Sequence, residues 1–449
     1  MQTALKSKFE SFGSQVAIID NEVSYHYHDV ISSIDSFTAL LNEKGIGQGD
    51  VVILFGDYSF HSITMFLALT FHKNIIVPLA STHQSEIDEK VGEIDPNWTI
   101  NVTGPSPVIA PCDPKAERHQ FLNKIAAANH AGLVLFSSGS TGKPKTMVHD
   151  LDNLVAASID KRPKKLSFIV FLMFDHIGGI NTLLNCISMG STMIIPKDRS
   201  PDHVAALIEK FKVNILPSSP TFLNLLLIGK SHEKFDLSSL RMITYGTEPM
   251  PDSLLTRLKS NFGRVKFLQT FGTSETGIAS TNSKSSSSTF LKIDDPNQEY
   301  RIVNKELWLR SKTQILGYLN HDNDAFTEDG WFKTGDLVEQ TDDGFIKIIG
   351  RAKEVINVGG EKVIPSEVES VLMDLDIITD CVVYGKPNPI VGQMVVAEVS
   401  LNQEMKLKEV KAIVKEHCNK RLESYKVPVK IIPVQKLDFS SRFKKSRLK

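Results

Sequence analysis

Short apolar runs alternate with helix-like patterns along the first half of the chain. Residues 51–55 and 74–78 are continuous apolar runs of strand length, and residues 59–71 between them have the apolar spacing of a helix. Continuous rather than alternating runs are expected where helices cover both faces of a sheet. This rhythm predicts an α/β architecture with largely parallel sheets.

The same alternation continues toward the middle of the chain and then changes. Further strands are expected at residues 133–136, 168–174, 192–196 and 242–245, and helices at residues 31–41, 203–211 and 221–227. From Lys353 onward, short strands mix with helices without this regular order. The change predicts a large α/β domain over residues 1–351 and a small α+β domain over residues 352–449.

Composition excludes several classes of protein. A chain of 449 residues with 41% hydrophobic and 23% charged residues is neither disordered nor collagenous nor a coiled coil. A net charge of −1 gives no overall attraction for nucleic acid. The four cysteines show no C-x-x-C spacing, which argues against a disulfide framework and a structural zinc site. With no apolar run of membrane-spanning length and a polar N-terminus, we expect a cytoplasmic protein.

The sharpest chemical feature is a polar loop directly after the strand expected at residues 133–136. Residues 137–145 read SSGSTGKPK. Backbone N–H groups of small residues can surround an anion, while the hydroxyls and the ammonium groups of Lys143 and Lys145 add donors and charge. The loop is not a Walker A motif, because Pro144 follows Lys143 where Ser or Thr is required. It predicts a phosphate-binding loop, with a flexible polar turn as the alternative.

A second segment, QTFGTSETG at residues 269–277, contains a hydroxyl beside a carboxylate. Ser274 and Glu275 together could hold Mg²⁺ against a phosphate, since this ion prefers hard oxygen ligands. Taken alone, the pair fits a helix start or a turn equally well.

Two further segments bear groups that suit a nucleotide. Asp336 follows a glycine in WFKTGD and could accept hydrogen bonds from two vicinal ribose hydroxyls, although alone it is the mark of a turn. Arg351 could pair with a phosphate or a ribose, and the pair Gly359–Gly360 permits close approach of the backbone.

The order of these four motifs resembles that of the AMP-forming adenylating superfamily, which includes acyl-CoA and aryl-CoA synthetases, luciferases and peptide-synthetase adenylation domains. The resemblance covers nearly the whole chain and includes YGTEPM at residues 245–250. The segment GGEKVIPSEVE, residues 359–369, looks most like the acyl-CoA synthetase branch. The resemblance implies a large multi-sheet adenylating domain and a small, mobile α+β C-terminal domain, with a hinge near Lys353.

The resemblance also implies a set of nucleotide-binding residues. Those matching the loop around the ATP phosphates are Ser137, Ser138, Gly139, Ser140, Thr141, Gly142, Lys143 and Lys145. Those matching the lining of the adenine and the passage to the acyl pocket are Gly246, Thr247, Glu248, Phe271, Gly272 and Thr273. Ser274 would contact a phosphate and Glu275 the Mg²⁺ ion, Asp336 would bind the ribose with Arg351 beside it, and Gly359 and Gly360 would flank the pantetheine arm of coenzyme A.

A catalytic lysine is implied near the C-terminus. The family pattern is Pro-Arg-Thr-x-x-Gly-Lys-x-x-Arg, and the chain reads DFSSRFKKSRLK from Asp438. The Lys-x-x-Arg spacing selects Lys444, with Lys445 as the alternative because Phe443 replaces the glycine. A basic tail that meets anionic surfaces is the other interpretation.

The acyl pocket is implied around residues 174–180. His176 matches the position beside the substrate carboxylate. Asp175 could pair with the ammonium of an amino-acid substrate, but we favour its capping the helix expected at residues 180–187. The segment 222–228, expected to be a helix of the pocket, is mostly apolar, which favours an aliphatic or aryl acid.

The implied reaction has two steps. A carboxylate attacks the α-phosphorus of Mg·ATP to give an acyl-adenylate, and a thiol, expected to be that of coenzyme A, then displaces AMP. Positioning and electrostatics carry such chemistry. Two alternatives stay open: a stand-alone adenylating enzyme that loads the phosphopantetheine of a carrier protein, and a non-catalytic nucleotide-binding relative. No nucleic-acid partner is expected, and the oligomeric state stays open.

Overall fold

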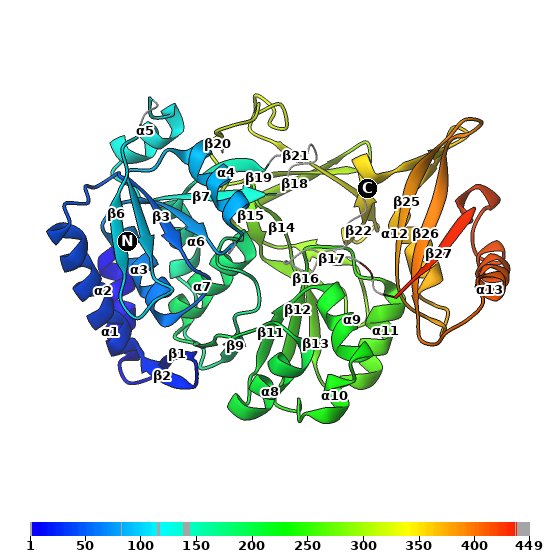
Figure 1. The fold of residues 1–449 in the computed structure, drawn as a ribbon, viewed down its shortest axis with the longest axis horizontal. Coiled ribbons are helices and arrows are strands. Elements are labelled where there is room, and N and C mark those ends of the chain that lie inside the picture. The colour runs from blue at the N-terminus through cyan, green and yellow to red at the C-terminus, as the bar shows by residue number, and fades with distance from the viewer. Residues whose placement is uncertain (1, 82, 115–116, 138–143, 436, 438–449) are drawn as a thin grey trace.

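The computed structural model describes residues 2–81, 83–114, 117–137, 144–435 and 437. Within these residues, two sheets of seven strands form the frame of the large N-terminal part (Figure 1). The first sheet has the order β13 (Lys266–Gln269), β12 (Met242–Tyr245), β11 (Ile215–Ser218), β9 (Ser167–Ile169), β10 (Thr192–Ile194), β1 (Val16–Asp20) and β2 (Val23–His26). Its strands are parallel up to β1, and β2 returns antiparallel.

The second sheet has a parallel centre and antiparallel edges. Its order is β20 (Gly317–Tyr318), β8 (Lys145–Asp150), β7 (Gly132–Ser137), β4 (Ile75–Leu79), β3 (Val51–Phe55), β5 (Trp98–Asn101) and β6 (Val108–Pro111). Strands β7, β4, β3 and β5 are parallel, while β20, β8 and β6 run antiparallel to their neighbours. The predicted α/β class with largely parallel sheets is confirmed.

Helices cover both faces of both sheets. The layer between the sheets contains α1 (Gln2–Phe12), α2 (Tyr27–Glu43), α3 (Phe60–Phe71), α6 (Leu151–Ile159) and α7 (Ile177–Met189). The outer layers contain α8 (Pro201–Phe211), α9 (Pro220–Ile228), α10 (Ser231–Lys234) and α11 (Asp252–Asn261) on one side and α4 (Gln84–Ile94) and α5 (Gln120–Ala127) on the other. In β3, Val52 and Leu54 therefore face one core and Val51 and Ile53 the other, which is why the run is apolar throughout.

The strand predicted at residues 168–174 is wrong in length. Strand β9 ends at Ile169, and the chain then leaves the sheet. The residues that follow are apolar because they are core residues of a loop: the ring of Phe174 lies 4.7 Å from that of Tyr58 and 5.3 Å from that of Phe66. A buried loop and a buried strand can both give a continuous apolar run in a sequence.

Antiparallel strands continue the chain beyond the two sheets. The hairpin of β14 (Phe271–Thr273) and β15 (Gly277–Ala279) leads into a sheet of β16 (Thr281–Ser283), β17 (Leu291–Ile293), β22 (Ile346–Arg351), β21 (Phe332–Gln340), β19 (Glu306–Ser311) and β18 (Gln298–Val303). This sheet has a core of its own around Leu291, Leu309 and Ile346.

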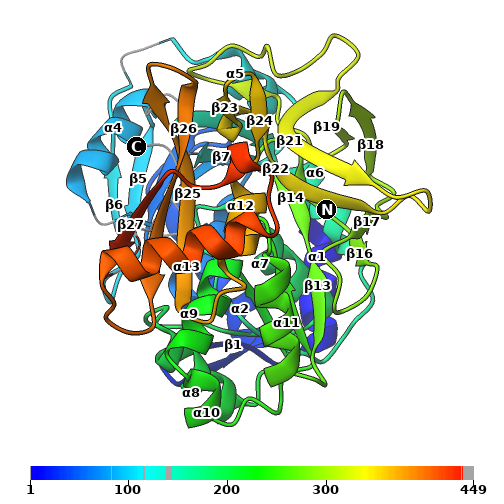
Figure 2. The same cartoon turned by 90° about the vertical axis from the view of Figure 1, so that its right-hand side faces the viewer.

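The C-terminal residues form an α+β unit, seen face-on in Figure 2. Its sheet contains β24 (Glu361–Val363), β23 (Ile356–Val358), β26 (Gly392–Leu401), β25 (Ile378–Asn388) and β27 (Lys430–Val434), packed against α12 (Pro365–Leu372) and α13 (Leu407–Asn419). The boundary predicted at residues 351 and 352 falls between β22 and a short 3-10 turn, Ala352–Glu354, and it stays a prediction. In the described part of the chain, no helix combines the length and apolarity needed to cross a bilayer.

Candidate active site

The carboxyl ends of strands from both sheets open onto one cavity of about 450 Å³, which we call the nucleotide cavity. Ser137 lines it from the end of β7, Ser218 from the end of β11, and Thr270 from just beyond β13. Ligands of parallel α/β sheets bind at this edge because the loops that leave the strands gather there. Residues from β21 and β22 close the cavity on the side of the C-terminal unit.

Ser274 and Glu275 lie at the tip of the β14–β15 hairpin, so the open choice between a helix start and a turn is settled as a turn. The backbone N–H of Thr276 donates to Oγ1 of Thr273 at 3.1 Å and fixes the turn. Gly272 permits the two strands to approach, because a Cβ atom there would lie 2.3 Å from the carbonyl oxygen of Gly277. The tight hairpin therefore presents the hydroxyl and the carboxylate to the cavity.

Tyr318 is a residue of the cavity that sequence reasoning missed. Its hydroxyl donates to Oε1 of Glu275 at 2.9 Å, and Nζ of Lys145 lies 4.7 Å from the centre of its ring. Burial, and then the carboxylate of Glu275, raise the pKa of Tyr318, so the phenol stays a donor. No local pattern of the sequence marks Tyr318. Gly317 before it has a φ of +151°, and a Cβ atom there would lie 2.4 Å from the Phe121 ring.

The charge of the nucleotide cavity is mainly positive. The cations among its described lining residues are Lys145, Lys333, Arg351 and Lys353, and the carboxylates are Glu275 and Glu306. Desolvation, followed by the charge of Arg351, lowers the pKa of Lys353, and Lys145 adds to this effect while Glu354 opposes it. A cluster of cations close enough to perturb one another suits a polyanionic ligand.

Asp336 lies behind the wall of the nucleotide cavity. It pairs across the strands with Arg351, whose Nε lies 3.1 Å from its Oδ1. Burial raises the pKa of Asp336, and Arg351 opposes that shift. Arg351 lines the cavity whereas the Asp336 side chain does not. Asp336, the residue expected to bind the ribose, is therefore covered by its ion-pair partner Arg351.

The remaining nucleotide residues divide into those that line the cavity and those that do not. Gly246, Thr247, Phe271 and Thr273 line it. The side chain of Glu248 does not, because its Oε1 accepts from the backbone N–H of Thr221 at 2.7 Å, in the first turn of α9.

Other predicted residues lie away from the cavity or outside the described residues. Gly359 and Gly360 form the exposed turn between β23 and β24, with φ values of +60° and +95°, and neither lines the cavity. The residues outside the described part of the chain are Ser138, Gly139, Ser140, Thr141, Gly142 and Lys143 of the loop, and Lys444 and Lys445 at the C-terminus.

His176 takes the capping role that we predicted for Asp175, so that prediction is wrong. Helix α7 begins at Ile177, and Nδ1 of His176 accepts from the backbone N–H of Gly178 at 3.0 Å. Asp175 is buried, with 4% of its surface exposed, and does not line the nucleotide cavity, whereas His176 does. The capping residue is thus one position later than predicted. His176 can cap the helix because an imidazole nitrogen accepts a hydrogen bond as a carboxylate does.

Helix α9 does not line the cavity, which corrects the expectation that residues 222–228 form the pocket. Its apolar side chains belong to the core beneath the first sheet, where the rings of Phe222 and Phe171 lie 4.3 Å apart. The residues before the helix, Pro217 and Ser218, line the cavity instead. The apolarity of α9 therefore reflects packing and carries no information about the acid.

Comparisons with known proteins agree with this geometry. The family model described as AMP-binding enzyme matches residues 5–319, and the model described as AMP-binding enzyme C-terminal domain matches residues 367–444. The probable CoA ligase CCL5 of Humulus lupulus is 28% identical to the chain, with 86% of this chain and 81% of that protein covered. The 2-succinylbenzoate–CoA ligase of Staphylococcus epidermidis (strain ATCC 12228 / FDA PCI 1200) is 24% identical, with 99% and 96% covered.

Solved structures show the same fold. The anthranilate CoA ligase AuaEII in complex with anthranoyl-AMP superposes with a TM-score of 0.82 at 19% identity, over 98% of this chain and 95% of that chain. The o-succinylbenzoate CoA synthetase MenE of Bacillus subtilis, in complex with the acyl-adenylate OSB-AMP, gives a TM-score of 0.78 at 18% identity, over 98% and 96%. The expected fold class is confirmed, and the expected enzyme class is confirmed at the level of the family. Because the first family model covers well over half of its length, the chain belongs to the AMP-binding enzyme family.

Proposed function

We propose that the protein activates a carboxylic acid with ATP to an acyl-adenylate and transfers the acyl group to a thiol, that of coenzyme A. The observation that carries this proposal is the nucleotide cavity, which cations from distant segments of the chain line together with the carboxylate of Glu275. The names of the relatives as CoA ligases support the choice of thiol.

The cavity provides groups for each part of the nucleotide. Ser137 and Lys145 are the described ends of the loop that would hold the phosphates, and Arg351 and Lys353 add positive charge. Gly246 and Phe271 would flank the adenine. Gly246 is suited to this, because a Cβ atom there would lie 2.7 Å from Oγ1 of Thr270 and would crowd the strand end.

Glu275 and Ser274 are the hard oxygen donors that fit a magnesium ion, and a bound ion would neutralise charge on the phosphates. The hydrogen bond from Tyr318 occupies Oε1 of Glu275 and leaves Oε2 available. Tyr318 would thereby fix the orientation of the carboxylate, as partners of metal ligands commonly do.

His176 would bind the carboxylate of the acid. The bond that its Nδ1 accepts assigns the ring proton to Nε2, which becomes a donor. A carboxylate oxygen would then attack the α-phosphorus, forming the acyl–phosphate bond while the bond to pyrophosphate breaks. In the second step the thiol sulfur attacks the acyl carbonyl, AMP leaves with the bonding electrons, and the thiol proton passes to solvent.

Two assignments complete the proposal. Lys444 would stabilise the charge that develops in the first step, with Lys445 as the alternative. Asp336 would bind the ribose hydroxyls in a state in which Arg351 has withdrawn, since the two side chains are paired here. The C-terminal unit, which begins beyond Arg351, would supply this movement.

Acid-dependent exchange of pyrophosphate into ATP tests the first step. Purified protein is expected to show exchange with one class of acid from a panel of fatty, aryl, hydroxy and amino acids. Adding coenzyme A or a phosphopantetheinylated carrier protein then identifies the acceptor. Tight ATP binding without exchange across the panel would contradict the proposal and favour a non-catalytic relative.

A further inference from the structure

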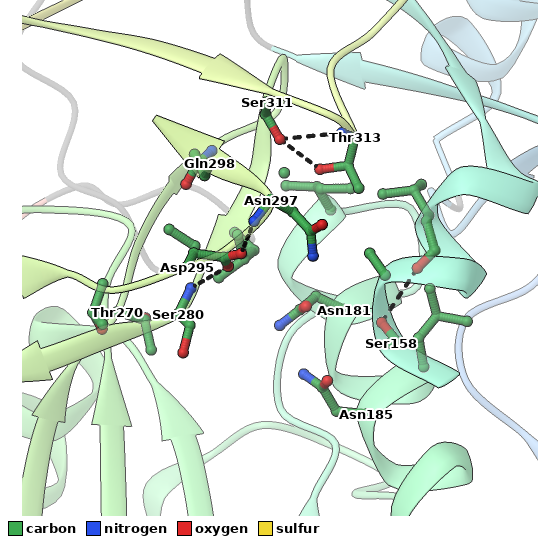
Figure 3. Close-up of a pocket in the computed structure, with 18 of the residues that line it drawn as sticks. Ser158, Asn181, Asn185, Thr270, Ser280, Asp295, Asn297, Gln298, Ser311 and Thr313 are labelled. Carbon is green, nitrogen blue, oxygen red and sulfur yellow. Dashed lines mark hydrogen bonds between the residues drawn. The ribbon is translucent and has the colours of Figure 1, made fainter. Parts of the chain in front are cut away.

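A second cavity of about 370 Å³, which we call the tail cavity, adjoins the nucleotide cavity. It lies between helices α6 and α7 on one side and the segment from β15 to β18 on the other (Figure 3). The two cavities share the lining residues Ile177, Asn181, Thr270 and Ile278. They therefore meet where α7 passes β15, just beyond His176.

Apolar side chains such as those of Ile180 and Leu184 line the tail cavity together with neutral hydrogen-bonding side chains. Asn181 and Asn185 are one turn apart on the same face of α7, and Asn297 approaches from the opposite side (Figure 3). Gln298 is buried, with 7% of its surface exposed, and its Nε2 donates to the backbone carbonyl of Thr276 at 3.4 Å. The asparagine side chains therefore offer donors and acceptors without charge to the tail cavity.

The charged groups of the tail cavity are already engaged and offset each other. Asp295 accepts the backbone N–H groups of Ser280 and Asn297, each at 2.8 Å. Lys161 lies exposed at the rim and donates to Oδ1 of Asn185. One cation and one anion, both held by protein groups, leave no net charge for an ionic tail.

We propose that the acid substrate extends along α7 into the tail cavity and carries there a neutral hydrogen-bonding group, such as a hydroxyl, carbonyl or amide. The path from Gly178, in the nucleotide cavity, to Asn185 spans seven residues, roughly 10 Å of helix. A plain alkyl tail would displace water from the amides without replacing its hydrogen bonds. This substrate class presupposes the proposed function, because the acid must first be held beside the nucleotide.

Pyrophosphate exchange with acids of matched length tests this substrate class. Octanoic, 8-hydroxyoctanoic and octanedioic acid differ only at the end that would reach the tail cavity. We expect kcat/KM for the hydroxy acid to exceed that for octanoic acid by about tenfold or more. An equal or better octanoic acid would overturn the inference and leave the proposed function intact. A preference for octanedioic acid would overturn the neutral tail and point to Lys161.

Substitutions of tail-cavity residues test whether this cavity selects the acid. Asn297→Leu and Asn181→Leu are expected to bring the hydroxy-to-alkyl ratio of kcat/KM close to one. Asn153→Leu, on the exposed face of α6, is the matched control and should keep the wild-type ratio. An unchanged ratio in both cavity variants would overturn the inference. Failure of the wild type to exchange with any acid would overturn the proposed function and this inference together.

Discussion

The nucleotide cavity and the tail cavity share a wall but differ in their chemistry. Four cations, Lys145, Lys333, Arg351 and Lys353, line the nucleotide cavity together with two carboxylates, Glu275 and Glu306. The tail cavity is lined by apolar side chains together with neutral amides and hydroxyls, and its two charged groups offset each other. Positive charge at the strand ends suits ATP, the polyanion that would react with every acid. Neutral polar groups can instead distinguish one acid from another.

Removing the carboxylate of Glu275 from the nucleotide cavity should have the largest effect. Glu275→Ala is expected to lower the exchange rate by about 100-fold or more for every acid, because electrostatic groups at the reacting centre contribute this much. The preference among acids should not change. Glu299→Ala removes an exposed carboxylate of β18 and serves as the control. A Glu275 variant that keeps the wild-type exchange rate but prefers a different acid would contradict the separate roles of the two cavities.

His149 is close to one lining residue of each cavity, Ser274 and Thr313, and should make the stability of the protein depend on pH. It is fully buried on β8, close to the backbone of Ser274 and Thr313, and burial lowers its pKa from 6.5 to about 4. The unfolded chain therefore binds a proton below pH 6.5 that the folded protein does not bind until about pH 4, so stability is lost as the pH falls.

Denaturant titrations at pH 7 and pH 4 measure this loss. The free energy of unfolding of the wild type should fall by about 3 kcal/mol more than that of His149→Leu. His83→Leu, at an exposed histidine, should behave as the wild type does. Parallel losses in the wild type and His149→Leu would contradict the assignment.

Tyr318 tests how the carboxylate of Glu275 is positioned in the nucleotide cavity. Tyr318→Phe keeps the ring beside Lys145 and removes only the hydrogen bond to Glu275. A hydrogen bond to a charged group of this kind corresponds to about tenfold in rate. Exchange should fall by that factor and should require more magnesium for half-maximal rate. An unchanged magnesium requirement would mean that Tyr318 does not position the carboxylate.

These residues also show how far the sequence could predict the site. Ser274 and Glu275 are neighbours in the chain, and a hairpin turn keeps neighbours together, so their shared location was predictable. Tyr318 reaches Glu275 only because β20 pairs with β8, a contact between distant segments that no local pattern reveals. Glu248 shows the converse: it lies beside cavity residues in sequence, but its carboxylate accepts a hydrogen bond from the backbone of Thr221 in α9.

The fold was predictable where one physical cause dominates a pattern. Residues 51–55 and 242–245 were predicted as strands and are found as β3 and β12 with the same limits, because β3 is buried on both faces and β12 is buried on one face and half-buried on the other. Residues 168–174 were predicted as one strand because a loop packed in a core is as apolar as a strand. Helix α9 was predicted to line the pocket because a helix packed in a core is as apolar as a pocket wall. The tail cavity could not be predicted, since its residues come from segments far apart in the chain.

The rim of the tail cavity should show the smallest effect. Asn185→Ala removes the acceptor of the exposed Lys161 ammonium, and exposed polar pairs contribute at most about 1 kcal/mol. We expect KM for the acid to change by less than about fivefold and kcat to stay the same. Steady-state exchange kinetics measure both, with Glu416→Ala, which removes the exposed partner of Lys420, as the control. A large fall in kcat would place the rim in the reaction itself.

The central claim is that the nucleotide cavity transfers an adenylyl group to a carboxylate. Phosphorus-31 NMR of the products formed from ATP, magnesium, the preferred acid and coenzyme A tests it most directly. We predict AMP and pyrophosphate in equal amounts, formed only when the acid is present. ADP and inorganic phosphate, or AMP formed without the acid, would contradict the account.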